Sequence, residues 1–135
     1  MAIVEINYLT VFVAAIVNMA IGFIWYGPAF GKAWLQLMGK RMEDINKKQI
    51  PKMYAAAFIA TLIMSYVLAH FVDYAEATTA IAGAQTGFWA WLGFIATVTL
   101  GSVLWEGKPP KLYILNNAYQ LISLVIMGAI LAVWV

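Results

Sequence analysis

The sequence predicts an all-α polytopic membrane protein. It would form a single domain over residues 1–135, with four transmembrane helices and a short interfacial helix in the first cytoplasmic loop. Three observations predict this: an apolar composition, four apolar runs of bilayer length, and positive charges confined to two loops. Of the residues, 64% are hydrophobic and 10% are charged, and the mean hydropathy is +0.85. Soluble domains carry about 25% charged residues, and a soluble fold of this size would not bury so much apolar surface.

Each apolar run has the length of about 20 residues that a helix needs to cross a hydrocarbon core of about 30 Å. Lipid offers no hydrogen-bond partner to the backbone, so each run must be helical. We predict spans at about residues 7–26, 53–72, 81–104 and 112–134. The first is interpreted as a retained span rather than a signal peptide, because no basic region precedes it and no small-residue cleavage site follows it.

The distribution of positive charge predicts the orientation. All 8 Lys and Arg residues lie in the loops between spans one and two and between spans three and four. These loops share one side of a four-span protein, and the positive-inside rule places them in the cytoplasm. We therefore predict a multi-pass protein of the cell (inner) membrane, with both termini and the loop at 73–79 outside.

The stretch GFIWYGPAFGKAW, residues 22–34, ends the first span. Its rings suit the headgroup level of a membrane, and Pro28 disfavours helical geometry in the residue before it. A new amphipathic helix beginning at Pro28 and ending at Gly39 would lie in the interface. An aromatic belt with a turn is the favoured interpretation, and a ligand-binding aromatic box is the alternative. The predicted interface anchors are Trp25, Tyr26, Trp34 and, after span three, Trp105.

Small residues recur along one face of span three at spacings of three, four and seven, and they include a literal GxxxG motif. Small residues let helix backbones approach closely, which matters where lipid supplies no hydrophobic drive between helices. We predict that this face lies at a close helix contact, in the bundle centre or between subunits of a homo-oligomer. Its members are Gly83, Gly87, Ala90, Thr97 and Gly101.

Polar residues inside the spans form the main candidate site. Asn18 and Ser123 lie near the predicted midplane, and three polar residues of span four share a helical face. Glu106, at the inner end of span three, is expected either to meet Asn116 and Asn117 at the polar start of span four or to cap the turn that follows it. Polar glue between helices one and four is the favoured interpretation, and a permeation or ligand path is the alternative. The candidate set is Asn18, Glu106, Asn116, Asn117, Gln120 and Ser123.

A second polar group lies near the outer end of span two. Tyr66, His70 and Asp73 share a helical face, and Gln85 of span three has a similar depth. A lone histidine without cysteine or other strong ligands does not make a metal site. A hydrogen-bonded interfacial cluster is favoured over a proton-sensitive group.

Catalytic signatures are missing from the sequence. It has no GxSxG, HExxH or Walker-type motif, and no cysteine for thiolate chemistry. No ionisable residue lies near a span centre, which argues against proton relays and voltage sensing. We expect no enzyme, no cofactor, no metal and no nucleic-acid partner.

Two blocks, WYGPAFGKAW (25–34) and GFIATVTLGSVLWEGKPPKLYILNNAYQLISLVIMGAIL (93–131), resemble a family of small, mostly bacterial four-span membrane proteins, classified as a domain of unknown function. The resemblance covers nearly the whole chain. It implies the same four-helix architecture and carries no activity. The residues that carry it are Trp25, Tyr26, Pro28, Phe30, Gly31, Lys32, Trp34, Gly101, Trp105, Glu106, Gly107, Asn117, Tyr119 and Gly128.

Two functions remain open from the sequence. One is an oligomeric channel or transporter for a small solute, because four short spans hardly enclose a path alone. The alternative is a non-catalytic membrane scaffold, or a protein that binds lipid or a partner. The expected partners are the lipid bilayer, further copies of the chain, and a small-molecule or lipid ligand. A hydrated cavity along the face of Asn18 and Gln120 would favour transport, and a dry seam would favour scaffolding.

Overall fold

A computed structural model describes residues 5–41, 43 and 47–134 of the chain, and its secondary structure over these residues is helical. Four of its helices are long and apolar enough to cross a membrane, and their ends differ from the predicted spans by less than one helical turn. The predicted all-α architecture is therefore confirmed. The four spans are Tyr8–Ala29, Ile50–Tyr74, Ala80–Leu104 and Pro110–Val133.

The elements follow in chain order, and two of the spans contain a π-helical turn. The first span joins α1 (Tyr8–Ile24) to the π turn η1 (Trp25–Ala29), and α2 (Gly31–Met38) follows it. The second and fourth spans are the single helices α3 (Ile50–Tyr74) and α7 (Pro110–Val133). The third span is divided into α4 (Ala80–Trp91), the π turn η3 (Leu92–Ala96), α5 (Thr97–Thr99) and α6 (Gly101–Leu104).

Local chemistry explains where the helices begin and end. The Asn7 side chain accepts hydrogen bonds from the backbone of Leu9 and Thr10 and so caps α1. Between α1 and α2 the backbone leaves helical geometry at Gly27, with φ −108° and ψ −107°, one residue before Pro28. α2 then ends at Gly39, whose φ of 69° is the left-handed conformation that glycine adopts without strain.

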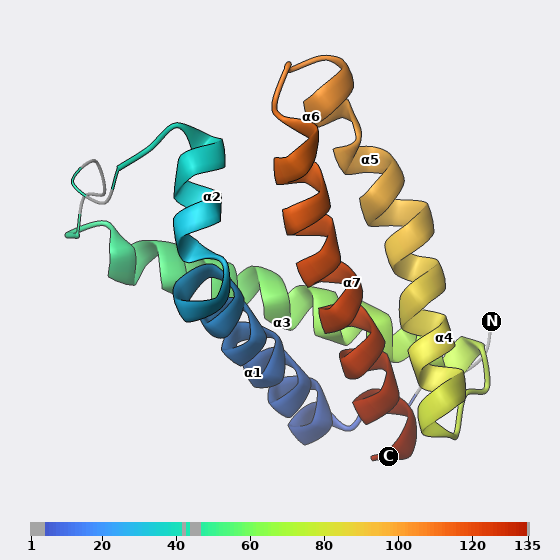
Figure 1. The fold of residues 1–135 in the computed structure, drawn as a ribbon. Coiled ribbons are helices and arrows are strands. Elements are labelled where there is room, and N and C mark those ends of the chain that lie inside the picture. The colour runs from blue at the N-terminus through green and yellow to red at the C-terminus, as the bar shows by residue number, and fades with distance from the viewer. Residues whose placement is uncertain (1–4, 42, 44–46, 135) are drawn as a thin grey trace.

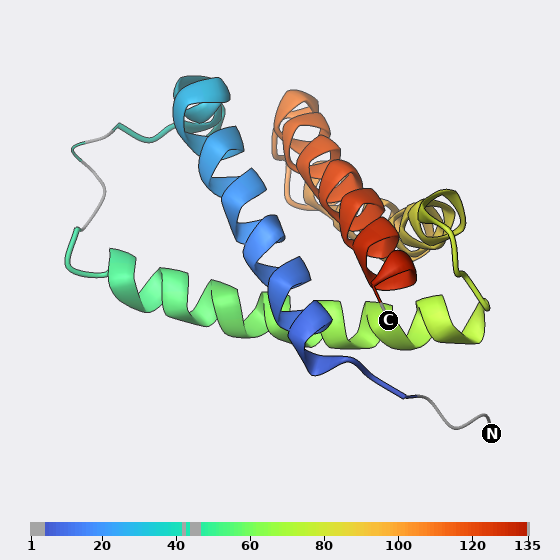
Figure 2. The same cartoon turned by 90° about the horizontal axis from the view of Figure 1, so that it is seen from below.

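Helix α7 is the centre of the bundle. It packs against α1, α3 and α4, and α2 lies beside its first half. Figure 1 shows α4–α6 standing alongside α7, while α3 runs across the other helices at a steep angle. In the turned view of Figure 2, α3 forms a separate layer beneath α1, α7 and α4.

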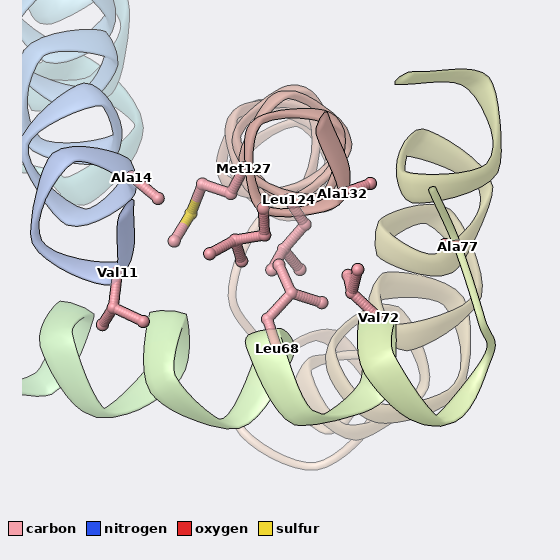
Figure 3. Close-up of a cluster of buried hydrophobic side chains, with 9 residues drawn as sticks. Val11, Ala14, Leu68, Val72, Ala77, Leu124, Met127 and Ala132 are labelled. Carbon is pink, nitrogen blue, oxygen red and sulfur yellow. The ribbon is translucent and has the colours of Figure 1, made fainter. Parts of the chain in front are cut away.

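The buried core lies where these two layers meet. Figure 3 shows Leu124 and Met127 of α7 between the side chains of α1 and those of α3. Met127 is fully buried. Packing of this kind contributes dispersion contacts, because lipid is already as apolar as the core. The buried cluster consists of Val11, Ala14, Leu68, Val72, Ala77, Leu124, Met127, Leu131 and Ala132.

Glycines allow the backbones of α4 and α7 to come into direct contact. A Cβ atom added at Gly83 would overlap the carbonyl of Gly128, and one added at Gly128 would overlap the carbonyl of Gly83. A Cβ atom added at Gly87 would overlap the carbonyl of Leu124. The GxxxG motif is therefore used within the chain, at the contact between spans three and four.

The rest of the predicted small-residue face does not lie on this contact. Ala90 is half-buried and packs against the core, but Thr97 is exposed, and a Cβ atom at Gly101 would lie 3.4 Å from the nearest atom, Cδ1 of Trp105. The cause is η3, because a π turn adds a residue and each residue rotates a helix by about 100°. The face that carries Gly83 and Gly87 therefore does not continue past residue 96.

The two ends of the bundle differ in charge. α2 and the turn between α6 and α7 lie at one end, which carries Lys32 and Lys108, and α1 begins at the opposite end, where α7 finishes (Figure 1). We call the first the basic end. The positive-inside rule predicts that it faces the cytoplasm.

Single-cysteine labelling checks this orientation. The chain has no native cysteine, so Gln49→Cys and Ala75→Cys each provide one reactive thiol on an exposed residue. In intact cells we expect an impermeant maleimide to label Ala75→Cys, and to label Gln49→Cys only after permeabilisation. Labelling of Gln49→Cys in intact cells would reverse the predicted topology.

Candidate functional site

A polar seam joins α1 and α7 in the middle of the bundle. Asn18 Nδ2 donates to Ser123 Oγ and lies 3.5 Å from Met127 Sδ. The hydroxyl of Tyr119 donates to Asn18 Oδ1 at 2.9 Å. We call these four residues the α1–α7 seam. Asn18 is 3% exposed, and its amide is satisfied by protein groups on both sides, so Asn18 is buried and hydrogen-bonded within the chain.

The aromatic residues of η1 also bind α7. Trp25 Nε1 donates to the carbonyl of Leu115 at 3.1 Å, and the hydroxyl of Tyr26 donates to Asn116 Oδ1 at 2.7 Å. The ring of Tyr26 packs edge-on against that of Trp34, with centroids 5.7 Å apart. The polar atoms of Trp25 and Tyr26, which the sequence predicts as interface anchors, are thus directed to a neighbouring helix.

Trp105 differs from these rings. It is 86% exposed at the end of α6. An exposed indole at the end of a span suits the predicted role of an anchor at the membrane surface.

Asn117 of the fourth span connects the fourth span to the third through hydrogen bonds. Its Nδ2 donates to Thr99 Oγ1 at 3.1 Å and to the carbonyl of Tyr113 at 3.0 Å. Its own carbonyl accepts from Trp91 Nε1 at 3.0 Å, and the hydroxyl of Tyr113 donates to the carbonyl of Ala96 at 2.6 Å. Asn117 is therefore a structural residue whose hydrogen bonds stabilise the broken third span.

A cavity of about 580 Å³ lies at the basic end, between α2, the α5–α6 segment and α7. We call it the basic-end cavity. It combines aromatic rings, amides, hydroxyls and one cationic side chain. Its lining residues are Tyr26, Trp34, Met38, Ile95, Thr99, Ser102, Lys108, Leu112, Tyr113, Asn116, Asn117 and Gln120.

Gln120 lines this cavity, but its side-chain oxygen is enclosed by the protein. Its Oε1 atom is buried and has no hydrogen-bond partner among the described residues. Buried polar atoms are nearly always paired in native proteins, and leaving one unpaired costs about 1–3 kcal/mol. The other buried amides, Asn18 and Asn117, are satisfied by protein groups. Gln120 Oε1 is therefore unpaired inside the bundle, where a group in the cavity does not reach it.

Glu106 does not join the polar residues with which the sequence groups it. Its carboxylate lies 3.9 Å from Lys108 Nζ, and the two side chains are 61% and 50% exposed. No hydrogen bond among the described residues connects it to Asn116 or Asn117. The chain turns at Gly107, with φ 69°, and Lys108 instead lines the cavity.

The predicted outer cluster is only partly assembled. His70 Nδ1 lies 2.9 Å from the carbonyl of Tyr66, and their rings pack edge-on. Asp73 lines a separate cavity of about 150 Å³. Gln85 is exposed on α4, and no hydrogen bond in the described part of the chain links it to the other three. Within residues 5–41, 43 and 47–134, no acidic or histidine group is arranged to hold a metal ion.

The candidate set predicted from the sequence leaves out several residues of the seam and the cavity. Tyr119 completes the seam, although the sequence marks it only through the family resemblance. Lys108, Thr99 and Ser102 line the cavity. The signal for the two hydroxyls was their spacing of three, which places them on one helical face.

Comparison with known proteins adds family membership to this geometry. The profile of a family described as a protein of unknown function (DUF1761) matches residues 9–132. No curated protein and no solved structure matches the chain. The matched region includes both the α1–α7 seam and the basic-end cavity.

Proposed function

We propose, for a chain that belongs to the DUF1761 family of proteins of unknown function, a non-catalytic membrane protein that binds an amphipathic ligand at the cytoplasmic end of its bundle. The observation that carries the proposal is the basic-end cavity of about 580 Å³, which is lined by aromatic rings, amides, hydroxyls and one cationic side chain, Lys108. Ligand pockets usually measure about 300–1,000 Å³ and place a few polar groups among apolar and aromatic walls. The basic-end cavity fits that description.

A channel or transporter has less support. The polar residues nearest the midplane bond to one another, and Asn18 and Ser123 are 3% and 0% exposed. A solute path along this face would have to break those bonds. A buried seam whose polar groups bond to one another favours binding or scaffolding over transport.

Homo-oligomerisation remains a prediction. The glycines of span three that suggested a subunit contact, Gly83 and Gly87, are occupied by α7 of the same chain. An oligomer would therefore use other surfaces of the bundle.

The substitution Gln120→Leu tests the proposed binding role. Leucine removes the buried unpaired oxygen, so we expect the ligand-free protein to melt several degrees higher in detergent. It also removes the amide side chain of residue 120 from the lining of the cavity. We therefore expect native mass spectrometry to detect at least tenfold less of any co-purifying amphiphile.

Ser123→Ala is the matched control on the same helix. It removes the acceptor of Asn18 Nδ2 and should lower thermal stability, while ligand retention stays unchanged. If Gln120→Leu is less stable and retains the same amount of amphiphile, Gln120 is a packing residue and the proposal fails.

A further inference from the structure

Asn116 supplies the basic-end cavity with a hydrogen-bond donor. Its Oδ1 atom accepts from the hydroxyl of Tyr26 at 2.7 Å, and its Nδ2 atom has no partner among the described residues. Among the buried and half-buried residues of that part of the chain, Gln120 Oε1 is the side-chain atom that lacks both a partner and solvent access. Asn116 Nδ2 lacks only the partner, so it is an accessible donor on a residue that lines the cavity.

Two further donors lie where α6 turns into α7. The backbone N–H of Lys108 donates to the carbonyl of Ser102 at 3.0 Å, and both residues line the cavity. The hydroxyl of Ser102 has no partner among the described residues, and it is open to solvent by the same criterion as Asn116 Nδ2. Lys108 Nζ lies 3.9 Å from the exposed carboxylate of Glu106, and exposed ion pairs of this kind contribute little.

The donors suit an anion with several oxygens. In the described part of the chain no carboxylate lines the cavity, so the charge of its lining is the single cation Lys108. Ser102 and Asn116 approach the space from different helices, α6 and α7. A carboxylate holds two oxygens in one plane, whereas a phosphate spreads its oxygens around a tetrahedron and is bound by lysine as a point charge. Donors on separate walls therefore favour a phosphate group.

The cavity also lies at the depth of lipid phosphates. Trp105, which ends α6, is 86% exposed, as an indole at the head-group level would be. Ser102 precedes it by less than one helical turn. The opposite wall contains the edge-on rings of Tyr26 and Trp34, which suit the less polar part of an amphipathic molecule. The cytoplasmic leaflet, which the basic end is predicted to face, carries anionic lipids.

We propose that the basic-end cavity binds the phosphate group of an anionic phospholipid. Lys108 supplies the positive charge, and Ser102 Oγ and Asn116 Nδ2 donate to phosphate oxygens. The aromatic wall contacts the less polar part of the lipid. This inference rests on the proposed function and specifies the head group of its ligand.

Four ligands that differ in one feature at a time test the assignment. Binding to the purified full chain in detergent is measured by native mass spectrometry for dioleoyl phosphatidate, dioleoylglycerol, oleate and glycerol phosphate. Dioleoylglycerol lacks the phosphate, oleate replaces it with a carboxylate, and glycerol phosphate lacks the acyl chains. We expect phosphatidate to bind about tenfold more tightly than each of the others, because hydrogen bonds to a charged group are the strong ones.

Variants of the three donors identify the groups that hold the phosphate. Lys108→Gln should weaken phosphatidate about tenfold and Ser102→Ala about threefold. Asn116→Asp keeps an acceptor for the Tyr26 hydroxyl but replaces the donor with a negative charge, so it should weaken phosphatidate by about tenfold or more. None of the three should change the binding of dioleoylglycerol.

Lys111→Gln is the matched control. It removes the same charge from an exposed lysine of α7 that does not line the cavity, and it should leave phosphatidate binding unchanged. If Lys108→Gln and Lys111→Gln weaken phosphatidate equally, the basic end attracts anionic lipid only by its overall charge, and the inference is overturned.

The ligand panel separates this inference from the proposed function. If dioleoylglycerol or oleate binds as tightly as phosphatidate, the phosphate assignment is wrong, although a protein that binds amphiphiles remains. If glycerol phosphate binds as tightly as phosphatidate, the donors hold a soluble phosphate ester, and both proposals of an amphipathic ligand fail. If none of the chain-bearing ligands binds the wild-type chain, the proposed function fails together with the inference.

Discussion

We expect Gly87→Ala to prevent stable folding of the bundle and Gly101→Ala, on the same span, to leave it intact. At Gly87 the added methyl group would overlap the backbone carbonyl of Leu124. α7 cannot move away from α4 to make room, because it is also packed against α1 and α3. Overpacking a core costs about 1–3 kcal/mol and occasionally more, and we expect about 3 kcal/mol or more here because the obstacle is backbone.

Gly101→Ala is the matched control, because its methyl group would meet only Trp105 Cδ1 at an ordinary 3.4 Å. Thermal unfolding in detergent, followed by size-exclusion chromatography, measures both variants. We expect Gly87→Ala to aggregate or melt far below the wild-type protein, and Gly101→Ala to remain within a few degrees of it. Equal melting temperatures would contradict the close contact between α4 and α7.

Asn18→Asp destabilises the bundle far more than Asn116→Asp. Asn18 donates to Ser123 and accepts from Tyr119 in a closed seam, and no cationic side chain takes part in that seam. A carboxylate near a bilayer midplane costs about 2.5–3.5 kcal/mol. The substitution also removes the donor to Ser123, so we expect a loss of about 3 kcal/mol.

Asn116 provides the comparison at the basic end. It is half-buried, and it lines the cavity that also contains Lys108, where water and a cation offset a new charge. We expect Asn116→Asp to cost less than about 1 kcal/mol, since charges near helix ends are hydrated. Comparable losses in chemical unfolding of both variants would mean that the seam is open to water.

The spans were predictable because hydropathy and length alone define a membrane helix, and lipid permits no other backbone structure. The polar face of span four was predictable for a similar reason, since helical periodicity places Asn116 and Gln120 together. The pairing of helices was not, because Asn18 meets Ser123 through a tertiary contact between the first and last spans. The sequence contains no signal for a contact between two residues so far apart in the chain.

The aromatic residues illustrate a second limit. Composition correctly indicates that Trp25 and Tyr26 prefer a mixed apolar and polar environment. Their polar atoms are satisfied by a lipid headgroup or by a protein group, and the sequence does not say which. In the structure both bind α7, at Leu115 and Asn116.

The backbone conformation at Gly107 determines which charged side chain lines the cavity. The position of Glu106 in the sequence, just before span four, predicts that it lies beside the polar start of that span. The left-handed turn at Gly107 leaves Glu106 exposed, and Lys108 lines the cavity. The charged side chain in the lining of the cavity is therefore Lys108 rather than Glu106.

Because of the π turn η3, the third span turns one helical face toward α7 before this turn and a different face after it. Before it, Gly83 and Gly87 hold α4 flush against α7. Beyond it, the hydroxyls of Thr99 and Ser102 border a space large enough for a ligand. The direct backbone contact at Gly83 and Gly87 thus lies before η3. At and beyond this turn the two spans are joined by side chains, such as Tyr113 and Asn117, and it is here that they leave room for the cavity.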